Sequence, residues 1–191
     1  MIQKYTYGTP FETDAIVTSI PASEGTPAYG TISTENGFSF TYDMDDNDVV
    51  YGLGESNRGI NKRGYVYESN CSDQPNHTED KISLYGAHNF LVISGKLTFG
   101  LFVDYPGKLK FDIGYTLSSQ LKITCEDADL YLYVIEGETP YDIVKQFRKI
   151  IGRSYIPPKF AFGFGQSRWG YTTKEDFRKV AAGYREKSYS Y

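Results

Sequence analysis

Asp73 is the first of two residues that could bind a ligand, judged from the residue type and its neighbours in the sequence. It lies in the middle of a polar segment, between Asn70 and Gln74. An aspartate among short polar residues often caps a turn. It could equally be a carboxylate held over a cleft, where it would accept hydrogen bonds from sugar hydroxyls. The residues themselves leave both interpretations open.

Trp169 is the second such residue and the only tryptophan of the chain. It follows Gln166-Ser167-Arg168 and precedes Gly170, whereas a core tryptophan usually lies within a periodic apolar run. This setting predicts a loop after a strand, which is where barrel enzymes build their sites. An indole there would offer a flat apolar surface to the C–H face of a pyranose ring.

Two other motifs are rejected. The glycines of the segment 54–59 have the spacing of a phosphate-binding loop, but Ile60-Asn61 replaces the required Lys-Ser/Thr pair. The acidic segment 43–48 resembles a calcium loop, yet it has no glycine at its sixth position. Gly54 also stands where the bidentate glutamate is needed. An acidic turn before a strand is the better interpretation.

The histidines and a basic cluster are given structural interpretations. His77 and His88 have no partner at metal-ligand spacing, so we expect hydrogen-bonded structural histidines. Arg58, Lys62 and Arg63 are interpreted as a solvated loop face rather than a nucleic-acid site. We therefore predict no metal site and no cofactor.

Composition narrows the class of protein. The 191 residues suffice for one domain, or for one domain and a fragment. The 18 tyrosines, 12 phenylalanines and 19 glycines favour sheets joined by tight turns. A net charge of −4 argues against nucleic acid or an anionic membrane as a partner. The sequence is silent on oligomeric state.

The cellular location is predicted to be the cytoplasm. The first residues lack the apolar core of a secretory signal, and no apolar run could span a bilayer. Cys71 and Cys125 are far apart in the chain and are interpreted as free thiols in a reducing compartment.

Strand patterns dominate the first 135 residues. Residues 1–28 have no period and are expected to be irregular, and residues 55–88 are expected to form a long, functional loop. Asn36-Gly37 should supply the positive φ angles of a hairpin turn. Short alternating segments with regular turn signals favour a β-sandwich, with strands expected at 30–34, 38–42, 49–54, 90–94, 97–103, 109–113, 121–124 and 130–135.

Helical patterns appear only near the C-terminus. One helix should begin at Thr139-Pro140 and end at Gly152. After Pro157-Pro158, the apolar run 160–165 is interpreted as a strand. A second helix should follow with Thr173 as its N-cap.

Three segments, and their order along the chain, resemble glycoside hydrolase family 31, the α-glucosidase group. The run from Pro157 to Tyr171 is similar to the start of that family's catalytic barrel. Tyr51-Gly52-Leu53-Gly54-Glu55 and Tyr85-Gly86-Ala87-His88-Asn89-Phe90 are similar to signatures of its N-terminal sandwich. The resemblance covers nearly the whole chain, up to about Glu186.

The resemblance implies a mainly β fold. A galactose-mutarotase-like β-sandwich would occupy residues 1–152, followed at 153–191 by the first βα unit of an incomplete (β/α)8 barrel. Asp73 and Trp169 match substrate-binding positions of the family. Its two catalytic aspartates lie on later barrel strands, so no catalytic residue is expected among these 191. The residues after Arg185 depart from the family pattern, which suggests a truncated enzyme.

The function implied is that of the N-terminal portion of a retaining α-glucosidase. The parent enzyme would act on terminal α-linked glucose of oligosaccharides, and this chain alone should be inactive. An alternative is a non-catalytic carbohydrate-binding module that keeps Asp73 and Trp169 as weak contacts to glucose or an oligosaccharide. A third is a remnant without a role, in which Phe160, Phe162 and Phe164 would expose apolar surface.

Overall fold

The computed structural model describes residues 1–73 and 75–189. The chain divides into two compact units, Met1–Arg153 and Ser154–Tyr191. The first unit contains every strand found in the described residues, and the second contains a short 3₁₀ helix and an α-helix. No helix among the described residues has the length and apolar character needed to cross a membrane.

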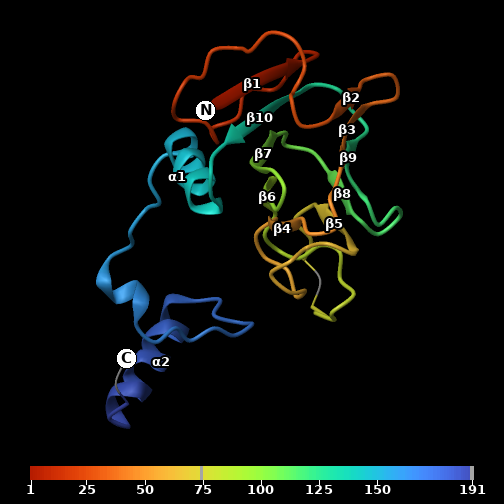
Figure 1. The fold of residues 1–191 in the computed structure, drawn as a ribbon. Helices are drawn as coiled ribbons and strands as arrows, with labels where there is room; N and C mark the ends of the chain where they lie inside the picture. Colours follow the sequence, from red (N-terminus) through yellow and green to blue (C-terminus); the bar gives the residue numbers. More distant parts are fainter. Residues whose placement is uncertain (74, 190–191) are drawn as a thin grey trace. The chain divides into compact units, whose positions relative to one another are not determined.

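The first unit is a sandwich of two five-stranded antiparallel sheets (Figure 1). One sheet contains, in spatial order, β1 (Ile2–Tyr7), β10 (Leu130–Glu136), β7 (Thr98–Asp104), β6 (Phe90–Ser94) and β4 (Val49–Gly52). The other contains β2 (Thr31–Ser33), β3 (Phe38–Asp43), β9 (Gln120–Cys125), β8 (Leu109–Ile113) and β5 (Tyr65–Ser69). The predicted β-sandwich is confirmed.

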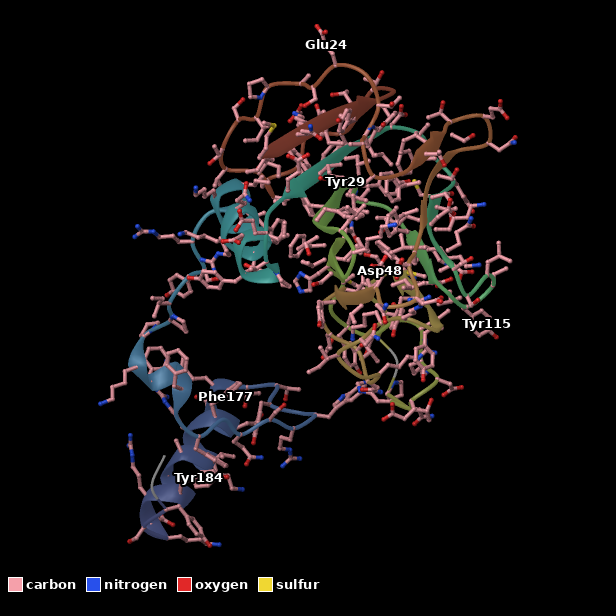
Figure 2. The ribbon with its side chains drawn as sticks, viewed as in Figure 1. Glu24, Tyr29, Asp48, Tyr115, Phe177 and Tyr184 are labelled. Carbon is pink, nitrogen blue, oxygen red and sulfur yellow. The ribbon has the colours of Figure 1, made fainter. Side chains whose placement is uncertain are left out.

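The core lies between the sheets, and strands such as β8 direct alternate apolar residues into it. In β8, Leu109, Phe111 and Ile113 are buried while Lys110 is exposed. Alternation of this kind places one face of the strand on the core and the other in water. Tyr29 packs against this core and stacks on Phe99, with ring centroids 4.4 Å apart (Figure 2).

The first predicted hairpin forms between β2 and β3, in a register that pairs Thr31 with Thr41. Its turn differs in one detail from the expectation. Gly37 has a φ of +80°, but Asn36 is not among the residues with positive φ. The four-residue connection needs the left-handed conformation only once, and glycine adopts it at the lowest cost.

Two strands contradict the sequence-based predictions. Residues 1–28 were expected to be irregular, yet β1 pairs with β10 from Ile2↔Ile135 to Tyr7↔Leu130. The long loop expected at 55–88 contains β5, which pairs with β8. Both are edge strands, and their partners are distant in sequence. Pairing and burial on one face therefore stabilise them without a strong local pattern.

Helix α1 (Pro140–Ile151) confirms the first predicted helix. Thr139 and Asp142 form a capping box, and Pro140 occupies the first turn. The helix covers the face of the first sheet that points away from the core (Figure 1). There Phe147 stacks on Phe90 of β6 with ring centroids 3.8 Å apart.

The second unit corrects the prediction of a strand at 160–165. Lys159–Phe162 forms a single 3₁₀ turn, η1, and no strand occurs in the described part of this unit. A parallel barrel strand obtains its hydrogen bonds from neighbouring strands, and none is present here to supply them. Phe160, Phe162 and Phe164 are exposed, with 59–83% of their surface accessible, which is the exposure that the remnant alternative described.

Helix α2 (Lys174–Glu186) confirms the second predicted helix, with Thr173 and Asp176 in a capping box. The preceding loop folds against it. Tyr171 contacts Phe177 with ring centroids 5.1 Å apart, and the Tyr184 hydroxyl donates to Gln166 Oε1 at 2.7 Å (Figure 2).

Candidate functional site

The segment that carries Asp73 is tied to β5 by backbone hydrogen bonds. Glu68 N donates to Ile82 O at 2.8 Å, and Ser72 N donates to Leu84 O at 3.0 Å. Leu84 anchors the return of the chain, with only 5% of its surface exposed. The residues that follow β5 and those around Leu84 are therefore held side by side.

Arg58 links the returning segment (residues 79–85) to β5 through side-chain hydrogen bonds. Its guanidinium donates to the carbonyl oxygens of Val66, Glu79 and Asp80 at 2.8–3.0 Å. The planar guanidinium spreads its donors widely enough to reach all three carbonyl oxygens, which a compact ammonium could not do. Arg58 is thus not simply solvated, as the sequence led us to expect, because its partly buried side chain donates to three backbone carbonyls of the folded segment.

Lys62 and Arg63 contradict the same expectation. Lys62 is buried, and its Nζ donates to Ser56 Oγ at 2.6 Å and to Gly59 O at 3.0 Å. Burial, and then the nearby positive charge of Arg58, lowers the pKa of the Lys62 ammonium. Arg63 donates to several backbone carbonyls, including that of Asp45 at 2.7 Å. All three cations bind the chain itself, because the turns they enclose leave carbonyls without strand partners.

The acidic turn at 43–48 is structural, as predicted. Asp48 is buried and accepts hydrogen bonds from the Tyr42 hydroxyl and from Asp45 N, both at 2.9 Å (Figure 2). The carboxylate therefore closes its own turn and joins it to β3. Across residues 1–73 and 75–189, no three His, Cys, Asp or Glu side chains group as a metal site would require.

Asp73 is exposed, and Tyr85 lies near it on the returning segment, which the Ser72 N to Leu84 O hydrogen bond holds beside the residues that follow β5. The Tyr85 ring also contacts the His77 ring, with centroids 5.2 Å apart. Partial desolvation, followed by the nearby negative charge of Asp73, raises the pKa of the Tyr85 hydroxyl. Asp73 is thus open to solvent, as a ligand-binding carboxylate must be.

A polar hollow of about 370 Å³ adjoins the same segment. Its lining comes from the end of β5 and the loops beside it, and comprises Ser69, Asn70, Cys71, Ala87, Asn89, Tyr105, Pro106, Gly107 and Lys108. Asn89 is held by donating to Tyr105 O at 3.1 Å. Amide, hydroxyl and ammonium groups in one hollow can exchange hydrogen bonds with a polyhydroxylated ligand.

Trp169 lies in the second unit and has 99% of its surface exposed. It precedes Gly170, whose φ of +112° turns the chain toward α2. The indole is therefore outside any core, as its sequence setting predicted. Asp73 belongs to the first unit and Trp169 to the second, so their meeting in one sugar pocket stays a prediction.

Sequence reasoning missed two residues of this region. Tyr85 was regarded only as packing material, and Arg58 only as a surface charge. Tyr85 lies in the Tyr-Gly-Ala-His-Asn-Phe segment, next to a glycine that allows the chain to approach Glu55. The strongest available signal was thus an aromatic residue inside a recognisable motif. Nothing local pointed to the carbonyls that Arg58 binds.

Comparison with known families assigns the two units separately. Residues 10–112 match the model of the glycosyl hydrolase 31 N-terminal galactose mutarotase-like domain. Residues 154–191 match the model of the glycosyl hydrolases family 31 TIM-barrel domain. The fold is therefore a galactose-mutarotase-like sandwich followed by the start of a TIM-barrel domain. The chain belongs to glycoside hydrolase family 31.

Individual relatives agree with this assignment. The chain is 31% identical over 163 residues to Alpha-glucosidase 2 of Bacillus thermoamyloliquefaciens, a match covering 80% of this chain and 21% of that protein. It is 28% identical over 120 residues to Alpha-xylosidase XylQ of Lactiplantibacillus pentosus, covering 63% and 15%. The chain thus spans about a fifth of its glucosidase relative.

A solved structure of similar fold is the GH31 dextranase FjDex31A of Flavobacterium johnsoniae complexed with glucose. The TM-score is 0.73 at 26% identity, and the match covers 82% of this chain and 19% of the dextranase. A variant of that enzyme has been solved complexed with isomaltotriose.

Proposed function

We propose that this chain is the N-terminal portion of a retaining α-glucosidase that acts on terminal α-linked glucose of oligosaccharides. The carrying observation is the order of its two family matches, a sandwich at 10–112 and a barrel start at 154–191. Its likeness to an α-glucosidase and to a glucose-bound dextranase supports glucose as the sugar.

In this proposal the chain supplies substrate contacts rather than the bond-breaking groups. Retaining hydrolysis uses two carboxylates about 5–5.5 Å apart, one as nucleophile and one as general acid and base. We assign neither role to any of the 191 residues. Asp73, which is exposed, would accept hydrogen bonds from glucose hydroxyls. Trp169, fully exposed, would pack against the C–H face of the ring.

The first test is an activity assay of the 191-residue polypeptide with p-nitrophenyl α-glucoside. The expected result is no turnover above buffer, because both catalytic carboxylates are assigned outside this chain. Turnover that co-purifies with the protein would contradict the assignment of roles. In parallel, the coding sequence downstream should encode the rest of a barrel. Finding none would favour a non-catalytic carbohydrate-binding module.

The second test is a titration with isomaltotriose followed by fluorescence of the single tryptophan. A saturable change is expected, and D73N should weaken the apparent affinity by about tenfold, since a charged hydrogen-bond acceptor is lost. Asp14 is an exposed aspartate of the same unit, so D14N is the matched control and should leave affinity unchanged. Equal affinity in wild type and D73N would remove Asp73 from the proposed site.

A cytoplasmic location is part of the proposal. Cys71 and Cys125 are both free thiols, and unpaired cysteines suit a reducing compartment. Fractionation of cells that express the natural gene would test this, and recovery of the protein from the medium would contradict it.

A further inference from the structure

The outward face of the second sheet carries a row of polar side chains across three adjacent strands. The register of β5, β8 and β9 places Glu68 opposite Lys110, and Lys110 opposite Thr124. Their sequence neighbours Phe111 and Ile123 are buried in the core. Because side chains alternate between the two faces of a strand, the three polar side chains share the face that points away from the core.

A hollow of about 460 Å³ includes this row in its lining. Connections between strands contribute Asn36, Tyr105 and Asp127 to the same hollow. It adjoins the polar hollow of about 370 Å³ beside residues 69–71, because Tyr105 and Lys108 line both. We call the two hollows together the polar groove. Its near end lies beside the segment that carries Asp73, and its far end lies over β8 and β9.

Hydrogen bonds and an ion pair hold the walls of the polar groove in place. The Tyr105 hydroxyl donates to Asp127 Oδ2 at 2.7 Å, and Asn89 Nδ2 donates to Tyr105 O at 3.1 Å. Lys108 Nζ lies 2.9 Å from Glu68 Oε1. Side chains that are ordered before a ligand arrives lose less freedom on binding, so the groove is partly preorganised.

The charges at the far end indicate the class of ligand. Carboxylates and ammonium groups are interspersed there, contributed by Glu68, Glu126, Asp127, Lys108 and Lys110. Mixed charges of this kind repel part of any polyanion or polycation, so they favour a neutral ligand that is rich in hydroxyl groups. Lys110 is exposed and takes part in no ion pair among the described residues, so its ammonium can donate to such a ligand.

We propose that the polar groove is a non-catalytic binding site for a neutral oligosaccharide, with successive sugar rings in its two hollows. The choice of an α-linked gluco-oligosaccharide rests on the proposed function. Each hollow alone falls in the range of about 300–1,000 Å³ that is typical of small-molecule sites. The groove therefore suits a chain of sugars better than a single ring, and isomaltotriose should bind more tightly than glucose.

The experiment is an isomaltotriose titration of the 15N-labelled 191-residue chain, followed through its backbone amide signals. Saturable shifts are expected at Lys110 and Thr124. K110A should weaken the apparent affinity at those signals by about three- to tenfold, since one charged donor is lost, with an unchanged thermal midpoint. Lys122 is exposed on the same face of β9 but lines neither hollow, so K122A is the matched control and should bind as wild type.

The outcomes separate this site from the proposed function. Shifts confined to Asp73 and Trp169 would overturn the groove and leave the proposed function standing, as would equal affinity in wild type and K110A. An equal loss in K110A and K122A would reveal a general charge effect and would also overturn the groove. Shifts at Lys110 and Thr124 that D73N leaves unchanged would support the groove as a separate site. No response of any amide would overturn both proposals.

Discussion

The guanidinium of Arg58 lies over the ring of Tyr65, with its Cζ atom 4.5 Å from the ring centroid. The same group donates to carbonyls on β5 and on the segment that returns toward Leu84. One side chain thus contacts strand β5, an aromatic ring of that strand and the returning segment. We therefore expect the conformation of the loop around Asp73 to depend on Arg58.

Replacing Arg58 by alanine is expected to destabilise the protein by about 2–3 kcal/mol, since several hydrogen bonds and a cation–π contact are lost. R58K keeps the charge but should recover only part of this loss, because an ammonium cannot serve the spread of carbonyls. Urea denaturation measures both effects. Hydrogen exchange should be fastest at residues 79–84 in R58A; uniform exchange across the sandwich would contradict a local clamp.

The stacking of Phe147 on Phe90 predicts how strongly α1 is held to the sheet. F147A should cost about 2–3 kcal/mol, less than a fully buried phenylalanine, because Phe147 is only partly buried. Tyr141 lies on the same helix with 74% of its surface exposed, so Y141A should change stability by less than about 0.5 kcal/mol. Thermal unfolding of the two variants gives the comparison, and equal losses would show that the stack is energetically unimportant.

Gly52 ends β4 with a φ of +117°, and a Cβ atom there would lie 2.4 Å from Phe90 O. G52A should therefore destabilise the protein by about 2 kcal/mol or more, since it adds both strain and a clash with backbone. Gly59 has no atom within 4 Å of its would-be Cβ and no positive φ. G59A should leave the free energy of unfolding unchanged or raise it by up to about 1 kcal/mol.

Asp104 makes stability depend on pH. It is buried at the end of β7, and burial, then the nearby charge of Glu12, raises the pKa of its carboxyl. Thr13, which donates to Asp104 Oδ1 at 2.6 Å, and Lys4 oppose that rise only in part. An acid with a raised folded-state pKa destabilises the fold once it ionises. The loss of stability grows as the pH rises from the pKa of the carboxyl in the unfolded chain, about 4, through its pKa in the folded protein.

D104N removes the charge but keeps an oxygen for the Thr13 hydroxyl. At pH 7 the variant should therefore be more stable than the wild type, and the difference should vanish near pH 4. Urea midpoints at several pH values measure this. A variant less stable than the wild type at pH 7 would show that the carboxylate is favourably paired.

Local sequence patterns were sufficient for most elements. The strand 109–113 was predicted with its final bounds, because its alternation of buried and exposed residues is strong. The first helix was recognised from Pro140 in its first turn, its apolar spacing and Gly152 at its end, and the second from its cap at Thr173. Each of these signals acts within a few residues of the chain. The types of Asp73 and Trp169 marked them as candidates in the same local way.

Elements that depend on distant partners were mispredicted. Strand β1 forms because it pairs with residues 130–135, and the sequence of residues 2–7 does not indicate that partner. The run 160–165 has the composition of a buried parallel strand but adopts a 3₁₀ turn, since no strand adjoins it in the described part of its unit.

By itself the sequence determined the sandwich, the two helices and the family, because alternation, capping and motif order are properties of neighbouring residues. Only the tertiary structure decided that the backbone of Ser72 bonds to that of Leu84 and that Arg58 binds carbonyls of β5 and of the returning segment. Those contacts depend on which residues of the returning segment lie beside β5. Strand pairing and burial over the whole sheet determine that position.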